Sequence, residues 1–226
     1  SWSLSFLIIL FLLLNLLYRY DVIDPTNKAY GLNYTNRSER PVYDRDHLLA
    51  LCTPDKVKRD ETNMLQILEN WRKKQQEEKP LMIIINTSGG GSRSAAFTMN
   101  VLQELDARTG GRLMDKTFLI TGASGGMFGA AYFRALSLLK QKDSGINLQD
   151  HRYTDDISKD LLNPLFSSFV ARDLASPAQK FRVGHYEYVK DRGYAFEQKL
   201  NINTHGVLDR QLRDIGPDEK AARMPL

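Results

Sequence analysis

Residues 81–94 read LMIIINTSGGGSRS and residues 117–126 read TFLITGASGG, and these two stretches decide the fold that the sequence predicts. Each stretch begins with a short apolar run and ends in a glycine-rich turn. A continuous apolar run is typical of a strand buried on both faces of a parallel sheet. Helical patterns follow at about 93–108 and 127–139. The repeated order of strand, turn and helix predicts an α/β fold with right-handed crossovers.

The composition fits one substantial α/β domain with an appendage. The chain has 226 residues, of which 42% are hydrophobic and 26% are charged, and its formal net charge is +4. This charge is mild, and we expect no nucleic-acid partner. A single cysteine, Cys52, excludes an internal disulfide. The four histidines are not at metal-ligand spacing, so we expect neither a metal nor an organic cofactor.

The N-terminal segment predicts a membrane anchor. Residues 2–18 are apolar except for Ser3, Ser5 and Asn15, which gives a stretch at the short end of what spans a bilayer. A signal peptide and a buried helix are the alternatives. We expect residues 1–20 to form a transmembrane anchor, either alone or as one of several spans. The basic residues that follow it place the rest of the chain in the cytoplasm: Arg19, Lys28, Arg37 and Arg40.

The remaining chain divides at Pro80. Residues 21–79 are expected to form a connector and then an amphipathic helix, in which apolar residues recur at helical spacing from Met64 to Trp71. Residues 80–226 begin with the repeated strand–turn–helix pattern, and we expect them to form the α/β domain, which is incomplete at its C-terminal end.

The second glycine turn matches a nucleophile elbow. In Gly122-x-Ser124-x-Gly126 a serine lies at the tip of a sharp strand-to-helix turn. Such a turn strains the serine backbone, and the neighbouring residues must be small to avoid collisions. The N-terminus of the following helix favours negative charge developing at the serine. Ser124 is therefore the candidate nucleophile.

The first glycine turn supplies a candidate oxyanion hole. Consecutive glycines at 89–91 allow several backbone N–H groups to point at one spot, as stabilisation of an oxyanion requires. This turn also follows a strand and opens a helix, and it precedes Ser124 by one strand–helix unit. Together the two turns indicate acyl transfer through a serine.

The two motifs resemble those of the patatin-like phospholipases. That family carries G-G-G-x-R-G, and residues 89–94 read Gly-Gly-Gly-Ser-Arg-Ser. The family also carries G-x-S-x-G, which residues 122–126 match in full. The resemblance implies a three-layer α/β/α sandwich with a mostly parallel sheet.

The resemblance also implies a role for each site residue. The amides of Gly89, Gly90 and Gly91 would hold the oxyanion, Arg93 would brace the loop, and Ser124 would attack the acyl carbonyl. The implied function is a serine lipid acyl hydrolase of the phospholipase or lysophospholipase type, acting on lipid of a bilayer. Acyl transfer to an acceptor other than water would use the same residues.

The chain departs from the family at two places. Ser94 stands where the family usually has glycine. The family completes a Ser–Asp dyad with the aspartate of an Asp-Gly pair, and the sequence contains no such pair. Residues 223–226 resemble the run-in to a buried strand, so we expect the aspartate beyond Leu226. The alternative is a non-catalytic, membrane-bound scaffold.

A nucleotide-binding oxidoreductase is a further alternative. Residues 121–129 resemble the glycine turn of short-chain dehydrogenases. Tyr186 and Lys190 offer that family's Y-x-x-x-K pair, and Asp143 follows at the distance of a ribose-binding acid. The glycine turn of those enzymes follows the first strand, whereas here a complete strand–glycine–helix unit precedes it.

A conventional triad is the last alternative. Either His185 or His205 could act as the base for Ser124, and Asp191 or Asp209 could orient that histidine.

Overall fold

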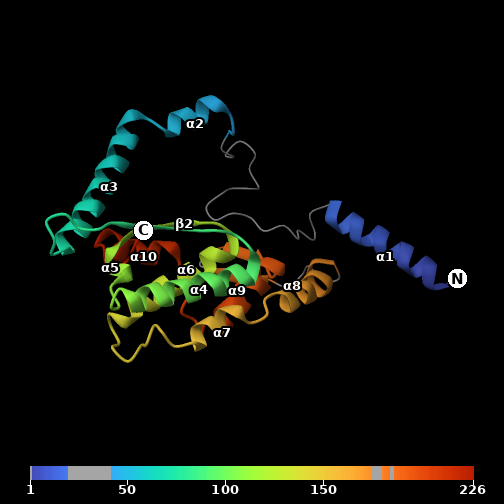
Figure 1. Cartoon of the computed structure of the whole chain (residues 1–226). Helices are drawn as coiled ribbons and strands as arrows, with labels where there is room; N and C mark the ends of the chain where they lie inside the picture. Colours follow the sequence, from blue (N-terminus) through green and yellow to red (C-terminus); the bar gives the residue numbers. More distant parts are fainter. Residues whose placement is uncertain (1, 20–41, 175–179, 184–185) are drawn as a thin grey trace. The chain divides into compact units, whose positions relative to one another are not determined.

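The computed structural model describes residues 2–19, 42–174, 180–183 and 186–226 (Figure 1). The chain forms two compact units: Ser1–Val42 with Leu161–Lys199, and Tyr43–Asp160 with Leu200–Leu226. Both glycine turns belong to the second unit. The first part of the expected connector, with Lys28, Arg37 and Arg40, lies outside the described residues.

The two apolar runs form a parallel strand pair in the second unit. β1 (Ile83–Thr87) and β2 (Thr117–Gly122) pair in a register that places Ile84 beside Leu119 and Thr87 beside Gly122. Because the strands are parallel, both glycine turns leave the pair at the same end. The backbone of Leu226 lies on the other side of β2, donating to the Phe118 carbonyl at 3.0 Å and accepting from the Ile120 amide at 2.9 Å.

Two helices follow the two strands and pack against each other. They are α4 (Gly91–Arg108) and α6 (Ser124–Lys140), which lie below the strands in the view of Figure 1. A side chain at Gly129 would overlap the Ala95 carbonyl, so the helix backbones approach closely there. The two helices bury a set of large apolar residues and an alanine at 2% exposure or less: Met99, Leu102, Ala130, Tyr132, Phe133, Leu136 and Leu138.

Five further described helices lie wholly in this unit. They are α2 (Arg45–Leu51), α3 (Pro54–Lys74), α5 (Leu113–Lys116), α7 (Arg152–Ser158) and α10 (Leu212–Lys220). The buried Trp71 of α3 meets the Phe118 ring edge-on at 6.1 Å. Asn70 donates to the Lys220 carbonyl at 2.7 Å, which links α3 to α10. Arg134 of α6 donates to the Pro225 carbonyl at 2.8 Å and so holds the last residues of the chain.

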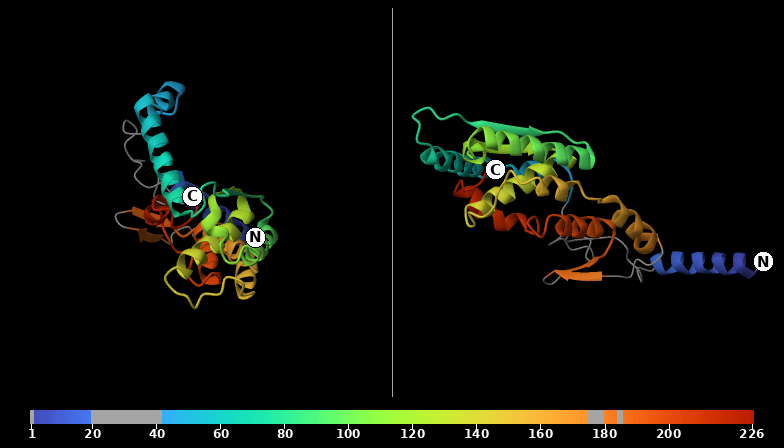
Figure 2. Two further views of the ribbon diagram at one scale, coloured as in Figure 1. Left: turned by 60° about the vertical axis from the view of Figure 1, so that its left-hand side comes forward. Right: turned by 60° about the horizontal axis from the view of Figure 1, so that its bottom comes forward.

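The first unit contains α1 (Trp2–Arg19), α8 (Leu162–Ser168) and the π-helix η2 (Phe169–Leu174). Its strands β3 (Lys180–Val183) and β4 (Tyr186–Val189) form an antiparallel pair, visible in the right-hand view of Figure 2. The helix α9 (Arg192–Asn203) begins in this unit. The ring of Phe181 packs on Tyr194 at 4.6 Å.

The expected three-layer α/β/α sandwich with a mostly parallel sheet is wrong. The described residues are mostly helical and contain two separate sheets of two strands each, one parallel and one antiparallel. The prediction extended the α/β domain beyond residue 140, past the strand–turn–helix pattern at 81–139. There the apolar residues instead recur every four positions, as in Tyr153, Ile157 and Leu161, and the first two of these bury one face of α7.

The expected transmembrane anchor and membrane localisation are also contradicted. Across the part of the chain that the structure describes, no helix has both the length and the apolar character needed to cross a membrane. The 18 residues of α1 rise by about 27 Å, which is less than the roughly 30 Å hydrocarbon core of a bilayer. Ser3, Ser5 and Asn15 interrupt its apolar sequence.

Replacing the core residue Phe133 should destabilise the fold strongly. Phe133 is 0% exposed, so Phe133→Ala leaves a cavity between α4 and α6, and we expect it to lower the free energy of unfolding by about 3–5 kcal/mol. Phe97 of α4 is 69% exposed, and the matched variant Phe97→Ala should cost less than about 1 kcal/mol. Urea unfolding monitored by circular dichroism measures both values. Equal losses would contradict the packing of α6 on α4.

Candidate active site

The chain turns sharply at Ser124, between β2 and α6. Ala123 is extended, with φ −140° and ψ 151°, and its amide donates to the Thr87 carbonyl at 3.2 Å. Ser124 then begins α6 with φ +53°, a left-handed backbone angle that costs a non-glycine residue about 1–3 kcal/mol. Ser124 is exposed at the tip of this turn. This is the geometry of the expected nucleophile elbow.

The glycines of the elbow allow the first glycine loop to pack directly on α6. A Cβ atom on Gly125 would overlap the Gly91 carbonyl, and one on Gly126 would overlap the Ser88 carbonyl. A Cβ atom on Gly122 would likewise overlap Thr87. The Ser88–Gly91 loop is therefore in backbone contact with the first turn of α6.

This contact brings the two predicted halves of the site together. A Cβ atom on Gly89 would lie 3.2 Å from the Ser124 Cβ and 3.8 Å from its Oγ. Gly90 and Gly91 have φ of +148° and +64°, and α4 begins at Gly91. The first amides of a helix have no partner within that helix. The N-termini of α4 and α6 thus meet beside Ser124, where the first amides of α4 lack partners within their helix.

The loop is braced by Ser94, which the sequence had singled out only as a departure from the family motif. Arg93, expected to brace it, is exposed, and among the described residues its side chain has neither a hydrogen bond nor an ion pair. Instead the Ser94 Oγ donates to the Ser88 carbonyl at 2.6 Å. The signal available in the sequence was a small hydroxyl residue in the first helical turn after the glycines, which can reach back to the loop.

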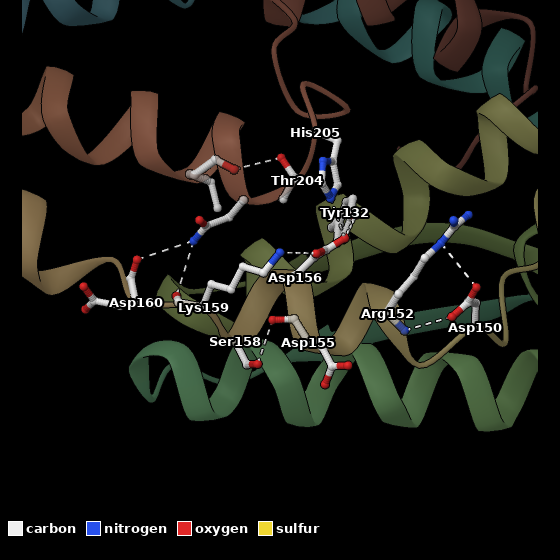
Figure 3. A network of polar contacts seen from close by, with 12 residues as sticks. Tyr132, Asp150, Arg152, Asp155, Asp156, Ser158, Lys159, Asp160, Thr204 and His205 are labelled. Atoms are coloured by element: carbon white, nitrogen blue, oxygen red, sulfur yellow. Dashed lines mark hydrogen bonds and ion pairs between the residues drawn. The ribbon is translucent and has the colours of Figure 1, made fainter.

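No proton acceptor is hydrogen-bonded to Ser124 in the part of the chain that the structure describes. Within the described ranges, the Ser124 hydroxyl has no hydrogen-bond partner. His185 lies outside those ranges. The Nε2 atom of His205 lies 3.3 Å from Asp156 (Figure 3), so its partner is neither Asp191 nor Asp209. The described contacts therefore do not assemble the alternative triad.

Asp156 is the centre of a separate polar network in the same unit (Figure 3). This buried carboxylate also accepts from Lys159 Nζ at 2.6 Å and from the Tyr132 hydroxyl at 3.4 Å. Burial, and next the negative charge of Asp156, raise the pKa of Tyr132 above its usual range, so the phenol remains a donor. His205 has φ +54° in the turn that ends α9. The network links α7, α6 and the end of α9.

The geometry also argues against a dinucleotide site. Asp143 follows the C-terminal end of α6 and accepts from the Gly145 amide at 2.9 Å. The 17 residues of α6 rise by about 25 Å, which separates Asp143 from the glycine turn at the other end of the helix. Lys190 lies over the Tyr194 ring at 5.5 Å, in the other unit. No group of three potential metal ligands is found among the described residues.

Comparison of the chain with protein-family models, with curated proteins and with solved structures finds no match. The chemical argument therefore depends on the two motifs and on their geometry. A strained, exposed serine lies beside a glycine loop where two helices begin, and helix N-termini stabilise negative charge. This arrangement can stabilise the oxyanion that forms when a serine attacks a carbonyl.

Adding a methyl group at Gly125 should disrupt the site. The new Cβ would meet backbone atoms of Gly91, which cannot move without shifting the loop, so we expect Gly125→Ala to cost about 3 kcal/mol or more. In the matched control Gly145→Ala, the new Cβ meets only the Asp143 carboxylate at 3.1 Å, which can turn toward solvent. The control should cost less than about 1 kcal/mol. Thermal unfolding compares the two, and a fully stable Gly125→Ala protein would contradict the close approach.

Proposed function

We propose that the protein is a serine hydrolase that cleaves an ester of a lipid, with motifs of the patatin-like phospholipase type. The observation that carries this proposal is the position of Gly89 against Ser124, which sits at a left-handed backbone angle. Nucleophile and oxyanion donors must lie within about 3 Å of one reacting group. Two turns from separate strand–helix units bring Ser124 and the glycine loop to one place, which supports the proposal.

In the proposed reaction, the Ser124 Oγ bonds to the acyl carbonyl carbon and its proton passes to a general base. The carbonyl oxygen becomes an oxyanion, which accepts hydrogen bonds from amides of the Gly89–Gly91 loop. The ester C–O bond then breaks, and the alcohol leaves with the proton from the base. Water repeats the sequence on the acyl-serine and releases the carboxylic acid.

The general base in this proposal is the aspartate of the Asp-Gly pair that the family resemblance implies. The 226 residues contain no such pair, so these residues alone should hydrolyse esters poorly. The site and the loop do not depend on that aspartate for their geometry, because backbone contacts between α6 and residues 88–91 define them.

The surface of α4 supports the proposal that the substrate carries a lipid acyl group. A shallow groove of about 540 Å³ runs along this helix, and its apolar lining includes the exposed Phe97, Val101 and Leu105. Phe97 is six residues from Gly91, which corresponds to about 9 Å along the helix. Exposed apolar surface of this kind often marks a binding site. A hydrocarbon chain whose ester lies at Ser124 could use it.

A non-catalytic binding role is the second candidate. The lack of a described proton acceptor at Ser124 favours it, since an unassisted serine hydroxyl is a weak nucleophile. In that role the glycine loop would bind an anionic group without turnover.

Labelling with a fluorophosphonate distinguishes the two candidates. In separate assays, the protein expressed from its complete gene is incubated with the fluorophosphonate probe and with the ester p-nitrophenyl butyrate. We expect one probe molecule per chain, bound to Ser124. The Ser124→Ala variant should not be labelled, and its rate of ester hydrolysis should fall by about 10³-fold or more. The control Ser92→Ala removes an exposed hydroxyl in the first turn of α4 and should retain both. An unlabelled wild-type protein would support the binding role, and hydrolysis by Ser124→Ala would exclude Ser124 as nucleophile.

A further inference from the structure

We infer that Ser94 is a positioning residue, which holds the Ser88–Gly91 loop in the orientation that presents its amides at Ser124. This inference rests on the proposed function of that site. Ser94 takes the bracing role that was expected of Arg93. It is also the position at which the chain departs from the family motif.

The first support is the hydrogen bond from Ser94 to the loop. Its Oγ lies 2.6 Å from the Ser88 carbonyl oxygen, six residues earlier in the chain. A serine within a helix usually donates to the carbonyl three or four residues before it, which would be Gly91 or Gly90. Ser94 instead reaches past the start of α4. Among the described residues, this is the only side-chain hydrogen bond to the backbone of the loop.

The second support is the rigidity of the peptide unit that Ser94 holds. The Ser88 carbonyl and the Gly89 amide belong to one planar trans peptide, so they point in opposite directions. Fixing the carbonyl therefore fixes the direction of the Gly89 N–H. Gly89 is the loop residue that lies against Ser124. Glycine gives this segment wide backbone freedom, which an external hydrogen bond has to remove.

The third support is the packing on both sides of this peptide. The Ser88 carbonyl lies against Gly126 of α6, while the Ser94 side chain lies against Gly90, whose Cβ would be 3.0 Å from the Ser94 Cβ. Ser94 is half-buried in this position. The Ser88 carbonyl is thus held between Ser94 and α6, and a loss of the hydroxyl leaves the loop restrained on one side only.

The test compares Ser94→Ala with Ser94→Thr in the protein expressed from its complete gene. Removing one oxyanion donor typically costs 10²–10³-fold in kcat, and misdirecting a donor should cost less, so we expect Ser94→Ala to lower kcat about 10–100-fold. KM should change little, because the residue does not touch the substrate's acyl chain. Ser94→Thr keeps the hydroxyl and should restore most of kcat. The rate of fluorophosphonate labelling should follow kcat.

The outcomes separate this inference from the function on which it rests. If the wild-type protein is labelled at Ser124 and Ser94→Ala has an unchanged kcat, the positioning role is overturned and the hydrolase proposal stands. If the wild-type protein is neither labelled nor active, both are overturned. A thermal unfolding scan accompanies each variant. If Ser94→Ala does not fold, Ser94→Cys, which keeps the volume but donates weakly, should give an intermediate kcat, and wild-type activity in it would overturn the inference.

Discussion

The close approach between the first turn of α6 and the Ser88–Gly91 loop is the constraint on which the rest of the site depends. A Cβ atom on Gly125 would overlap the Gly91 carbonyl, so the loop could not occupy its position beside any other residue type. The approach continues along the two helices to Gly129, which lies against Ala95. One set of glycine contacts thus determines how α4 packs on α6 and how near the loop lies to Ser124.

This constraint also explains why a strained serine is stable where it is. The left-handed backbone of Ser124 costs about 1–3 kcal/mol. The parallel register of β1 and β2, the bond from the Ala123 amide to Thr87 and the buried face of α6 all hold the turn in place. The turn leaves Ser124 exposed beside the N-termini of α4 and α6, whose partial positive charges favour an oxyanion.

The sequence predicted the local parts of the site because they depend on neighbouring residues. The apolar runs predicted short strands before glycine turns, and β1 and β2 form there, but Ile84 is 60% exposed, so β1 is not buried on both faces as expected. The elbow pattern identifies Ser124 by its own steric requirements. The pairing of Asp156 with His205, and the choice by Ser94 of a carbonyl six residues away, do not follow from residue spacing alone. They depend on helix ends and loop paths, which no periodic pattern encodes.

The larger errors came from extending local patterns. Two strand–helix units suggested a wide sheet, but the residues after α6 have the four-residue apolar spacing of helices and fold accordingly. The apolar run at 2–18 suggested an anchor, although its helix is short for a bilayer and contains polar residues. The two glycine motifs predicted the local geometry of a turn, whereas the architecture that the family resemblance implied was wrong.

The central claim is that Ser124 and the Gly89–Gly91 loop form one acyl-transfer site. The most direct measurement is a crystal structure of the protein after reaction with a fluorophosphonate, whose phosphonyl oxygen occupies the place of the oxyanion. The account predicts a bond between phosphorus and the Ser124 Oγ, with the phosphonyl oxygen about 3 Å from amide nitrogens of the loop. A phosphonyl oxygen directed into solvent, or a probe bound to another residue, would contradict it.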